Sequence, residues 1–141
     1  GFPFTVFVAT DLLDNGGGGR YMTWEQIRQL KTAGVTIGAH SADHGHLPEL
    51  TDNEILTSLQ RSLNSFEREL GYTPSLFAYP YGEMSLAVRK IIEEMGFIMA
   101  FGQHSGVAES GLDPFFQPRF AHSGGIHRVA VPAEKRRAGP Q

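Results

Sequence analysis

Short apolar runs alternate with segments of helical periodicity through most of this chain, and that alternation restricts the fold more than any other feature. Four runs of β-branched, aromatic and small residues have the composition and length of buried strands: 4–9, 35–39, 76–79 and 97–101. The segments between them carry apolar residues at helical spacing. Strand-helix-strand units form parallel pairs joined by right-handed crossovers. The sequence therefore predicts an α/β fold with parallel strands.

Capping signals predict where the helices between these strands begin and end. Two pairs fit capping boxes at helix N-termini: Thr23 with Gln26, and Thr51 with Glu54. Ser85 is the expected N-cap of a third helix. A glycine follows the last periodic residue of each segment: Gly34, Gly71 and Gly96. Helices are therefore expected from the residues after Thr23, Thr51 and Ser85 up to these glycines.

Composition argues against several classes of protein. The 141 residues include 40% hydrophobic and 19% charged residues with a net charge of −3, which is typical of a globular domain. The short basic run 135–137 is read as a solvated tail, so no nucleic-acid partner is expected. No apolar stretch reaches the roughly 20 residues of a membrane span. Because cysteine is absent, any metal ion must be bound by histidine, carboxylate or water.

The alternation ends after the fourth apolar run. From Gly102 to Pro118 the chain is rich in Gly, Ser and Pro and is expected to be a loop, with Arg119-Phe120 as a short last strand. Residues 1–120 are expected to form the core, and residues 121–141 a partly disordered tail.

Two histidines directly follow the second expected strand. His40 and His44 are four residues apart, so both imidazoles can face one point from a single helical turn. Imidazole is the commonest protein ligand for zinc and related metals. In alternating strand-helix folds, ligands bind where the parallel strands end. The pair is therefore a candidate metal site, with a pair of ordinary loop histidines as the alternative.

Two motifs in this chain resemble those of the polysaccharide deacetylases, also called carbohydrate esterase family 4. The segment His40-Ser41-Ala42-Asp43-His44 with the following leucine-bearing turn resembles the family's His-Ser/Thr-x-x-His motif. Phe77-Ala78-Tyr79-Pro80-Tyr81-Gly82-Glu83 resembles its Arg-x-Pro-Tyr-Gly motif. The two motifs occur in the family's order, and the likeness extends from about residue 2 to about residue 120.

The resemblance implies a fold, a cofactor and site residues. The implied fold is a distorted or partial (β/α) barrel, and the implied cofactor is a divalent metal ion, zinc above all, held by His40 and His44. Tyr81 matches the family tyrosine whose backbone N–H stabilises an oxyanion, although a turn whose ring only fills space is an alternative. His46 lies outside the matched pair and is not expected to bind the metal. The resemblance also assigns four residues to substrate binding: Tyr79, Pro80, Gly82 and Arg119.

The chain departs from the family pattern at one strand end. Ala78 stands where the family has an arginine that contacts the catalytic carboxylate. Arg119 is the obvious substitute, and an ordinary salt bridge is an equally open reading of that residue.

Two further family motifs are missing from this sequence. The Thr-Phe-Asp-Asp motif of the family's first strand has no counterpart, so that N-terminal strand is expected to be missing and the chain as given to be inactive. Asp11 and Asp14 follow the wrong strand, and only Asp11 is kept as a lesser candidate. The family's late general-acid histidine motif is also not recognisable. Three histidines remain as candidates by elimination: His104, His122 and His127.

The expected function is metal-dependent hydrolysis of a C–N bond other than a peptide bond, which removes N-acetyl groups from a polymer such as chitin, peptidoglycan or poly-N-acetylglucosamine. Two alternatives stay open: a non-catalytic carbohydrate-binding or structural remnant, and an amidase acting on small cyclic amides. The resemblance implies a cell-envelope or extracytoplasmic setting, although the sequence itself fixes no compartment. A sheet that lacks its first strand exposes an edge, which favours oligomerisation.

Overall fold

A sheet of four parallel strands forms the centre of the computed structural model, which describes residues 4–14, 18, 20–104, 111–121 and 127–128. The strands pair in chain order, β1-β2-β3-β4. Their bounds are β1 (Thr5–Val8), β2 (Thr36–Ala39), β3 (Leu76–Ala78) and β4 (Met99–Phe101). Their registers run Val8↔Ala39, Ala39↔Phe77 and Ala78↔Phe101, so the carboxyl ends of the strands lie close together. The expected α/β fold with parallel strands is confirmed.

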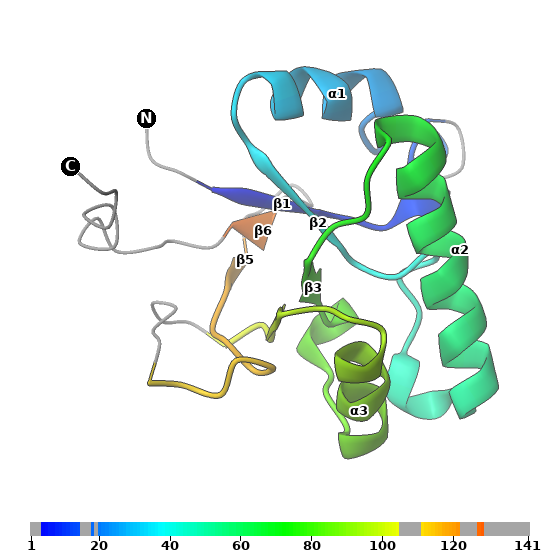
Figure 1. The fold of residues 1–141 in the computed structure, drawn as a ribbon, viewed down its shortest axis with the longest axis vertical. Coiled ribbons are helices and arrows are strands. Elements are labelled where there is room, and N and C mark those ends of the chain that lie inside the picture. The colour runs from blue at the N-terminus through cyan, green and yellow to red at the C-terminus, as the bar shows by residue number, and fades with distance from the viewer. Residues whose placement is uncertain (1–3, 15–17, 19, 105–110, 122–126, 129–141) are drawn as a thin grey trace.

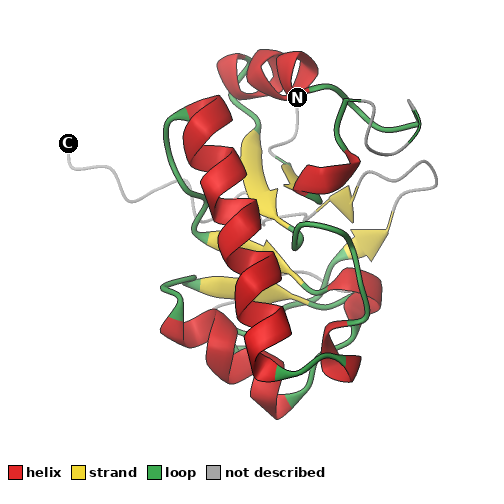
Figure 2. Ribbon diagram, turned by 90° about the vertical axis from the view of Figure 1, so that its right-hand side faces the viewer, coloured by secondary structure: helices red, strands yellow, loops and turns green. Residues whose placement is uncertain are grey.

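Three α-helices connect the strands: α1 (Trp24–Thr32), α2 (Asp52–Leu70) and α3 (Leu86–Glu94). Short 3-10 helices follow the first three strands: η1 (Thr10–Leu12), η2 (Leu47–Glu49) and η3 (Pro80–Gly82). The long helix α2 lies across one face of the strands (Figure 2). None of the helices in the described ranges has both the length and the apolarity needed to cross a bilayer.

Both capping boxes form as the sequence predicts. Thr23 accepts from the N–H of Gln26 at the start of α1, and Thr51 accepts from the N–H of Glu54 at the start of α2. The N-cap of α3 is Ser85, whose hydroxyl accepts from Val88. These caps satisfy backbone donors that the first helical turns leave unpaired.

The strands are packed on both faces, as parallel sheets require. Alternate residues of β1 enter two different clusters: Val6 and Val8 pack with the helices, whereas Phe7 packs with Ala78 and Phe101. Gly38 lies opposite Phe7 in the register, and a Cβ there would lie 2.5 Å from the Phe7 ring. The small residues in β2 and β3 therefore make room for aromatic rings on the face of the sheet away from the helices.

The segment after β4 is more regular than the sequence indicates. It runs beside β4, where Ala100 donates to Pro114 O at 2.9 Å and receives a bond from Gln117 N at 2.9 Å. Two more strands follow, β5 (Phe120–Ala121) and β6 (His127–Arg128), which pair antiparallel. The expectation of a strand at Phe120 is confirmed, but β6 was not predicted, because two residues carry no periodicity. In Figure 1 this pair lies on the side of β1–β3 away from α2.

The sheet ends at β1 within the described part of the chain, and the backbone of β6 lies close to that strand. Oligomerisation through this edge stays a prediction. Of the expected tail, the structure describes residues 121, 127 and 128, and the rest lies outside the described residues.

Candidate metal and oxyanion site

Three aromatic side chains meet where β2 and β3 end. The ring centroids of His40 and His44 are 4.5 Å apart, and those of His44 and Tyr81 are 4.6 Å apart. In both pairs the rings meet at a steep angle, 65° and 62°. Residues from the two motif loops, distant in sequence, therefore form one cluster.

His40 is held in a fixed orientation at the end of β2. Its backbone N–H donates to Val8 O at 3.1 Å, and its ring Nδ1 lies 2.7 Å from the carbonyl oxygen of Ala78. A carbonyl can only accept, so Nδ1 carries a ring proton, and in the neutral form of the ring Nε2 would carry the lone pair. Metal-binding histidines usually donate their other ring N–H to such a carbonyl or carboxylate. The buried His40 ring is therefore in the tautomer that binds metals through Nε2.

His44 lies on a turn that hydroxyl groups stabilise. Both Ser41 and His44 have positive φ, 62° and 59°, which residues with side chains seldom adopt. The buried Ser41 hydroxyl accepts from the His44 N–H at 3.0 Å, and Ser58 of α2 accepts from Ala42 N at 3.3 Å. Burial, together with the cation of Arg119, lowers the pKa of His44 below its ordinary value of 6.5. His44 is therefore neutral at pH 7, as a metal ligand must be.

The donor set fits part of a metal site. Two imidazoles lie side by side, which suits zinc and its neighbours. Within the described residues, no third histidine or carboxylate joins them to complete a ligand group. Asp11 instead pairs with Arg61 at 2.8 Å, and Asp14 accepts from the backbone N–H of Trp24 at 2.9 Å. Both early carboxylates therefore have structural partners.

Tyr81 lies in a strained turn. Its φ of 59° and ψ of 11° are left-handed, between Pro80, which fixes its own φ, and Gly82 with φ of 68°. Two hydrogen bonds close the turn, from Gly82 N to Tyr79 O at 2.9 Å and from Glu83 N to Pro80 O at 3.1 Å. The backbone N–H of Tyr81 has no protein acceptor among the described residues. The turn thus leaves one backbone donor available to a ligand, on the residue whose ring contacts His44.

Arg119 is buried beside the same cluster. Its side chain is 1% exposed, and the nearest acceptor is Tyr79 O, 3.4 Å from Nη2. Its Nε and Nη1 have no hydrogen-bond partner in the described part of the chain, and the guanidinium lies 5.7 Å from the Phe7 ring centroid. Burial lowers its pKa to about 10, so the group still carries its charge at pH 7. A buried charge of this kind needs an anionic partner.

Two of the residues predicted to bind substrate, Tyr79 and Pro80, are buried in the structure. Tyr79 is fully buried and donates its hydroxyl to Phe115 O at 2.8 Å, and burial raises its pKa. Pro80 is also buried, so both residues form the floor of the turn. Substrate binding by Tyr79, Pro80, Gly82 and Arg119 stays a prediction.

Of the three histidines proposed by elimination, the structure describes the ring of His104 alone. His104 is exposed, and its ring packs against Phe116 with centroids 4.7 Å apart. His122 lies outside the described residues, and only the strand assignment is described for His127.

Two residues of this region were missed in the sequence. His46 stacks on Tyr81 with ring centroids 4.0 Å apart and planes at 9°, and its Nδ1 lies 3.0 Å from a carboxylate oxygen of Glu83. His46 and Glu83 are 37 residues apart, so no local pattern links them. His46 extends the row of rings from the buried His40 to the surface, and the Glu83 carboxylate lies at its outer end.

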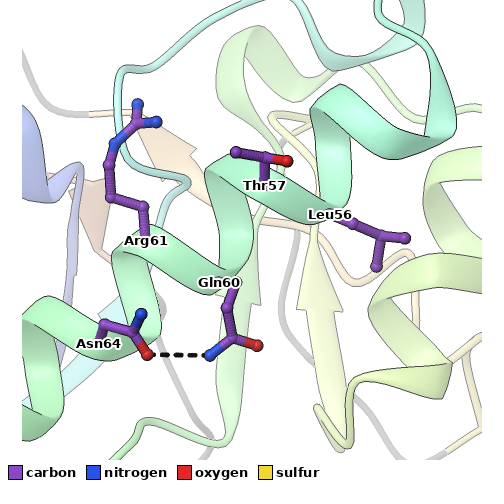
Figure 3. Close-up of a pocket in the computed structure, with 5 residues that line it drawn as sticks. All are labelled: Leu56, Thr57, Gln60, Arg61 and Asn64. Carbon is purple, nitrogen blue, oxygen red and sulfur yellow. Dashed lines mark hydrogen bonds between the residues drawn. The ribbon is translucent and has the colours of Figure 1, made fainter.

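Two shallow grooves lie along α2, away from this cluster. Figure 3 shows the larger, of about 520 Å³, lined by Leu56, Thr57, Gln60, Arg61 and Asn64. The smaller, about 320 Å³, includes Asp43 but none of the three clustered rings. Neither groove therefore coincides with the candidate site.

Comparison with known proteins points to one family. The sequence profile of the polysaccharide deacetylases matches residues 1–100. Chitin deacetylase 1 of Cryptococcus neoformans is 33% identical over 72 residues, which are 51% of this chain and 15% of that protein. The putative polysaccharide deacetylase YxkH of Bacillus subtilis is 25% identical over 131 residues, 93% of this chain and 43% of that protein.

A solved structure shares the fold. The Streptococcus pyogenes deacetylase PplD, determined in complex with acetate, superposes with a TM-score of 0.75 at 20% identity, over 82% of this chain and 51% of that chain. At this identity the likeness concerns the fold alone. The chain thus spans about half of that structure, and less than half of either curated relative.

We expect Gly82→Ala to destabilise the chain more than Gly71→Ala does. Both glycines have positive φ, 68° and 75°, which costs an L-residue roughly 1–2 kcal/mol. A Cβ at Gly82 would also lie 2.5 Å from the Gln103 Cβ and 2.9 Å from its backbone N, whereas nothing lies within 4 Å at Gly71. Overpacking adds about 1–3 kcal/mol. Urea unfolding measures both losses, and equal losses would show that the Tyr81 turn is not tightly packed.

Proposed function

Because this chain belongs to the polysaccharide deacetylase family, we propose that it carries the metal-binding and oxyanion-stabilising part of a site that hydrolyses N-acetyl groups of an amino-sugar polymer. The named relatives include a chitin deacetylase, which makes a β-linked N-acetylglucosamine polymer the first substrate to test. The class of reaction is hydrolysis of a C–N bond other than a peptide bond.

One observation carries this proposal. The imidazoles of His40 and His44 lie side by side at the rim of the sheet, the ring of Tyr81 lies against that of His44, and the Tyr81 N–H has no acceptor among the described residues. Deacetylation needs a Lewis acid and a fixed donor at one oxygen, since negative charge develops there when water attacks the carbonyl. The rim of this sheet supports both roles within one cluster.

The residues of this chain would act on the substrate as follows. His40, fixed by Ala78 O, and the neutral His44 would hold a divalent metal ion, most simply zinc. When bound, such an ion polarises the acetyl carbonyl and lowers the pKa of a coordinated water. The Tyr81 N–H would donate to the oxygen that gains charge. Water adds to the carbonyl carbon, the C–N bond breaks, and the amine takes a proton as acetate leaves.

A general base must take the proton from the attacking water, and Arg119 indicates where a carboxylate belongs. Its guanidinium is buried next to His44, and two of its nitrogens lack partners among the described residues. A carboxylate in contact with Arg119 would pair the charge and lie beside the metal ligands. Arg119 would then take the role of the family arginine whose place in the Arg-x-Pro-Tyr-Gly motif is occupied here by Ala78.

The second candidate function is a carbohydrate-binding domain without catalysis. It is favoured by the two-histidine ligand set, since no third ligand is found within the described residues. The two candidates differ in acetate release, which only the enzyme produces.

We expect the chain to bind zinc through both histidines. His40→Ala and His44→Ala should each abolish zinc binding, measured by competition with a chromophoric chelator, because each removes one of two described donors.

Tyr81→Phe should bind zinc normally and keep near-normal activity, because the proposed donor is its backbone. The full-length protein, with whatever segments flank these residues, should release acetate from chitin oligosaccharides in a zinc-dependent manner.

The His44→Ala full-length protein is the matched control for that assay. Acetate release that is unchanged in this variant contradicts the proposed metal site. Zinc binding without any acetate release on amino-sugar polymers favours the non-catalytic domain.

We expect Arg119→Met to stabilise the 141-residue chain. The substitution keeps much of the volume and removes a buried charge that lacks a partner among the described residues, and such replacements stabilise by roughly 1–4 kcal/mol. In the full-length enzyme the same change should lower kcat, because the catalytic carboxylate loses its partner. Arg61→Met, which removes an exposed charge paired with Asp11, is the control and should not stabilise. A less stable Arg119→Met chain would show that the charge is already paired.

A further inference from the structure

The hydrogen bonds of its turn restrain the backbone of Tyr81 but leave its ring without a partner on the turn. A tyrosine with φ of 59° is in a region that residues with side chains seldom occupy. Its ring cannot be held by the core, because the residue is 48% exposed. Contacts at the surface must therefore keep the ring, and with it the backbone N–H, in place.

His46 provides the closest such contact. Its ring stacks on Tyr81 with centroids 4.0 Å apart and planes at 9°, whereas His44 meets the same ring at 62°. A parallel stack at this distance is a favourable aromatic contact when the rings are offset. His46 therefore restrains the half-exposed Tyr81 ring by stacking on one of its faces.

His46 is itself fixed at both its backbone and its ring. Its carbonyl accepts from Glu49 N at 3.0 Å at the start of η2, and its Nδ1 lies 3.0 Å and 3.1 Å from the two Glu83 carboxylate oxygens. Glu83 is two residues beyond Tyr81 on the same turn, and its N–H bonds to Pro80 O. His46 therefore links the Tyr81 ring, on which it stacks, to Glu83, whose backbone belongs to the same turn as Tyr81.

We propose that His46 and Glu83 are positioning residues that fix Tyr81 and, through its ring, His44. They form a clamp between the loop after β2 and the turn after β3, the two segments that carry the metal-ligand and oxyanion candidates. This inference rests on the proposed function for its consequence in catalysis, while the clamp itself is a feature of the free protein. Neither residue touches the substrate in this account.

The test compares His46→Ala with His46→Phe, which keeps a stacking ring but loses the Glu83 contact. Two readouts are taken on the chain: the Tyr81 backbone amide resonance after ¹⁵N-tyrosine labelling, and the affinity for Co²⁺ from its absorption spectrum. His46→Ala should move the amide resonance and weaken Co²⁺ binding roughly tenfold, as outer residues of metal sites do. His46→Phe should restore only part of each, because the ring stack on Tyr81 remains while the bond to Glu83 is lost.

Arg61→Ala is the matched control, since it breaks an ion pair of similar exposure, 47% and 38% against 45% and 40% for His46 and Glu83. It should leave the amide resonance and Co²⁺ affinity unchanged. In the full-length enzyme, His46→Ala should lower kcat with little change in KM, because the substrate does not contact the clamp.

The two proposals fail in different ways. If the amide resonance of Tyr81 stays in place in His46→Ala, the positioning role is wrong, whatever the metal does. If Co²⁺ does not bind the unmodified chain, the proposed metal site is wrong, while the amide resonance still decides the clamp. A His46→Phe chain that behaves like His46→Ala would also overturn the stacking argument.

Discussion

The hydrogen bond between His40 Nδ1 and Ala78 O joins the ends of β2 and β3, and the candidate site is arranged around it. At 2.7 Å it fixes both the orientation and the tautomer of a buried imidazole. The bond is available because β2 and β3 are parallel neighbours, with Ala39 opposite Phe77, so both strands end at the same rim. His44 and Tyr81 then pack outward from His40 in a row of rings.

Backbone strain is concentrated in the two loops that carry this row. Ser41, His44 and Tyr81 all have positive φ, an arrangement that persists only where neighbouring groups hold it. The Ser41 hydroxyl supports the first loop and the hydrogen bonds of Gly82 and Glu83 support the second. Arg119 adds a second cost, a buried charge without an anionic partner among the described residues. Strain and unpaired charge at one rim are typical of a site arranged for a ligand rather than for stability.

Local chemistry explains which parts of this structure could be predicted. The helix starts at Thr23, Thr51 and Ser85 follow from side chains that bond within three residues, and the strands follow from apolar runs, so both were predicted correctly. The proximity of His40 and His44 to Tyr81 could be expected once the strands were known to be parallel. The contact of His46 with Glu83, the burial of Arg119 and strand β6 depend on tertiary packing between distant segments, and no pattern in the sequence records them.

The central claim is that His40 and His44 bind one metal ion together. X-ray absorption spectroscopy at the zinc edge of the loaded protein tests it most directly, because it identifies the ligand atoms without reference to activity. We expect scattering from two imidazoles at about 2.0–2.1 Å, reduced to one in His44→Ala. A spectrum without imidazole scattering, or one unchanged by His44→Ala, would contradict it.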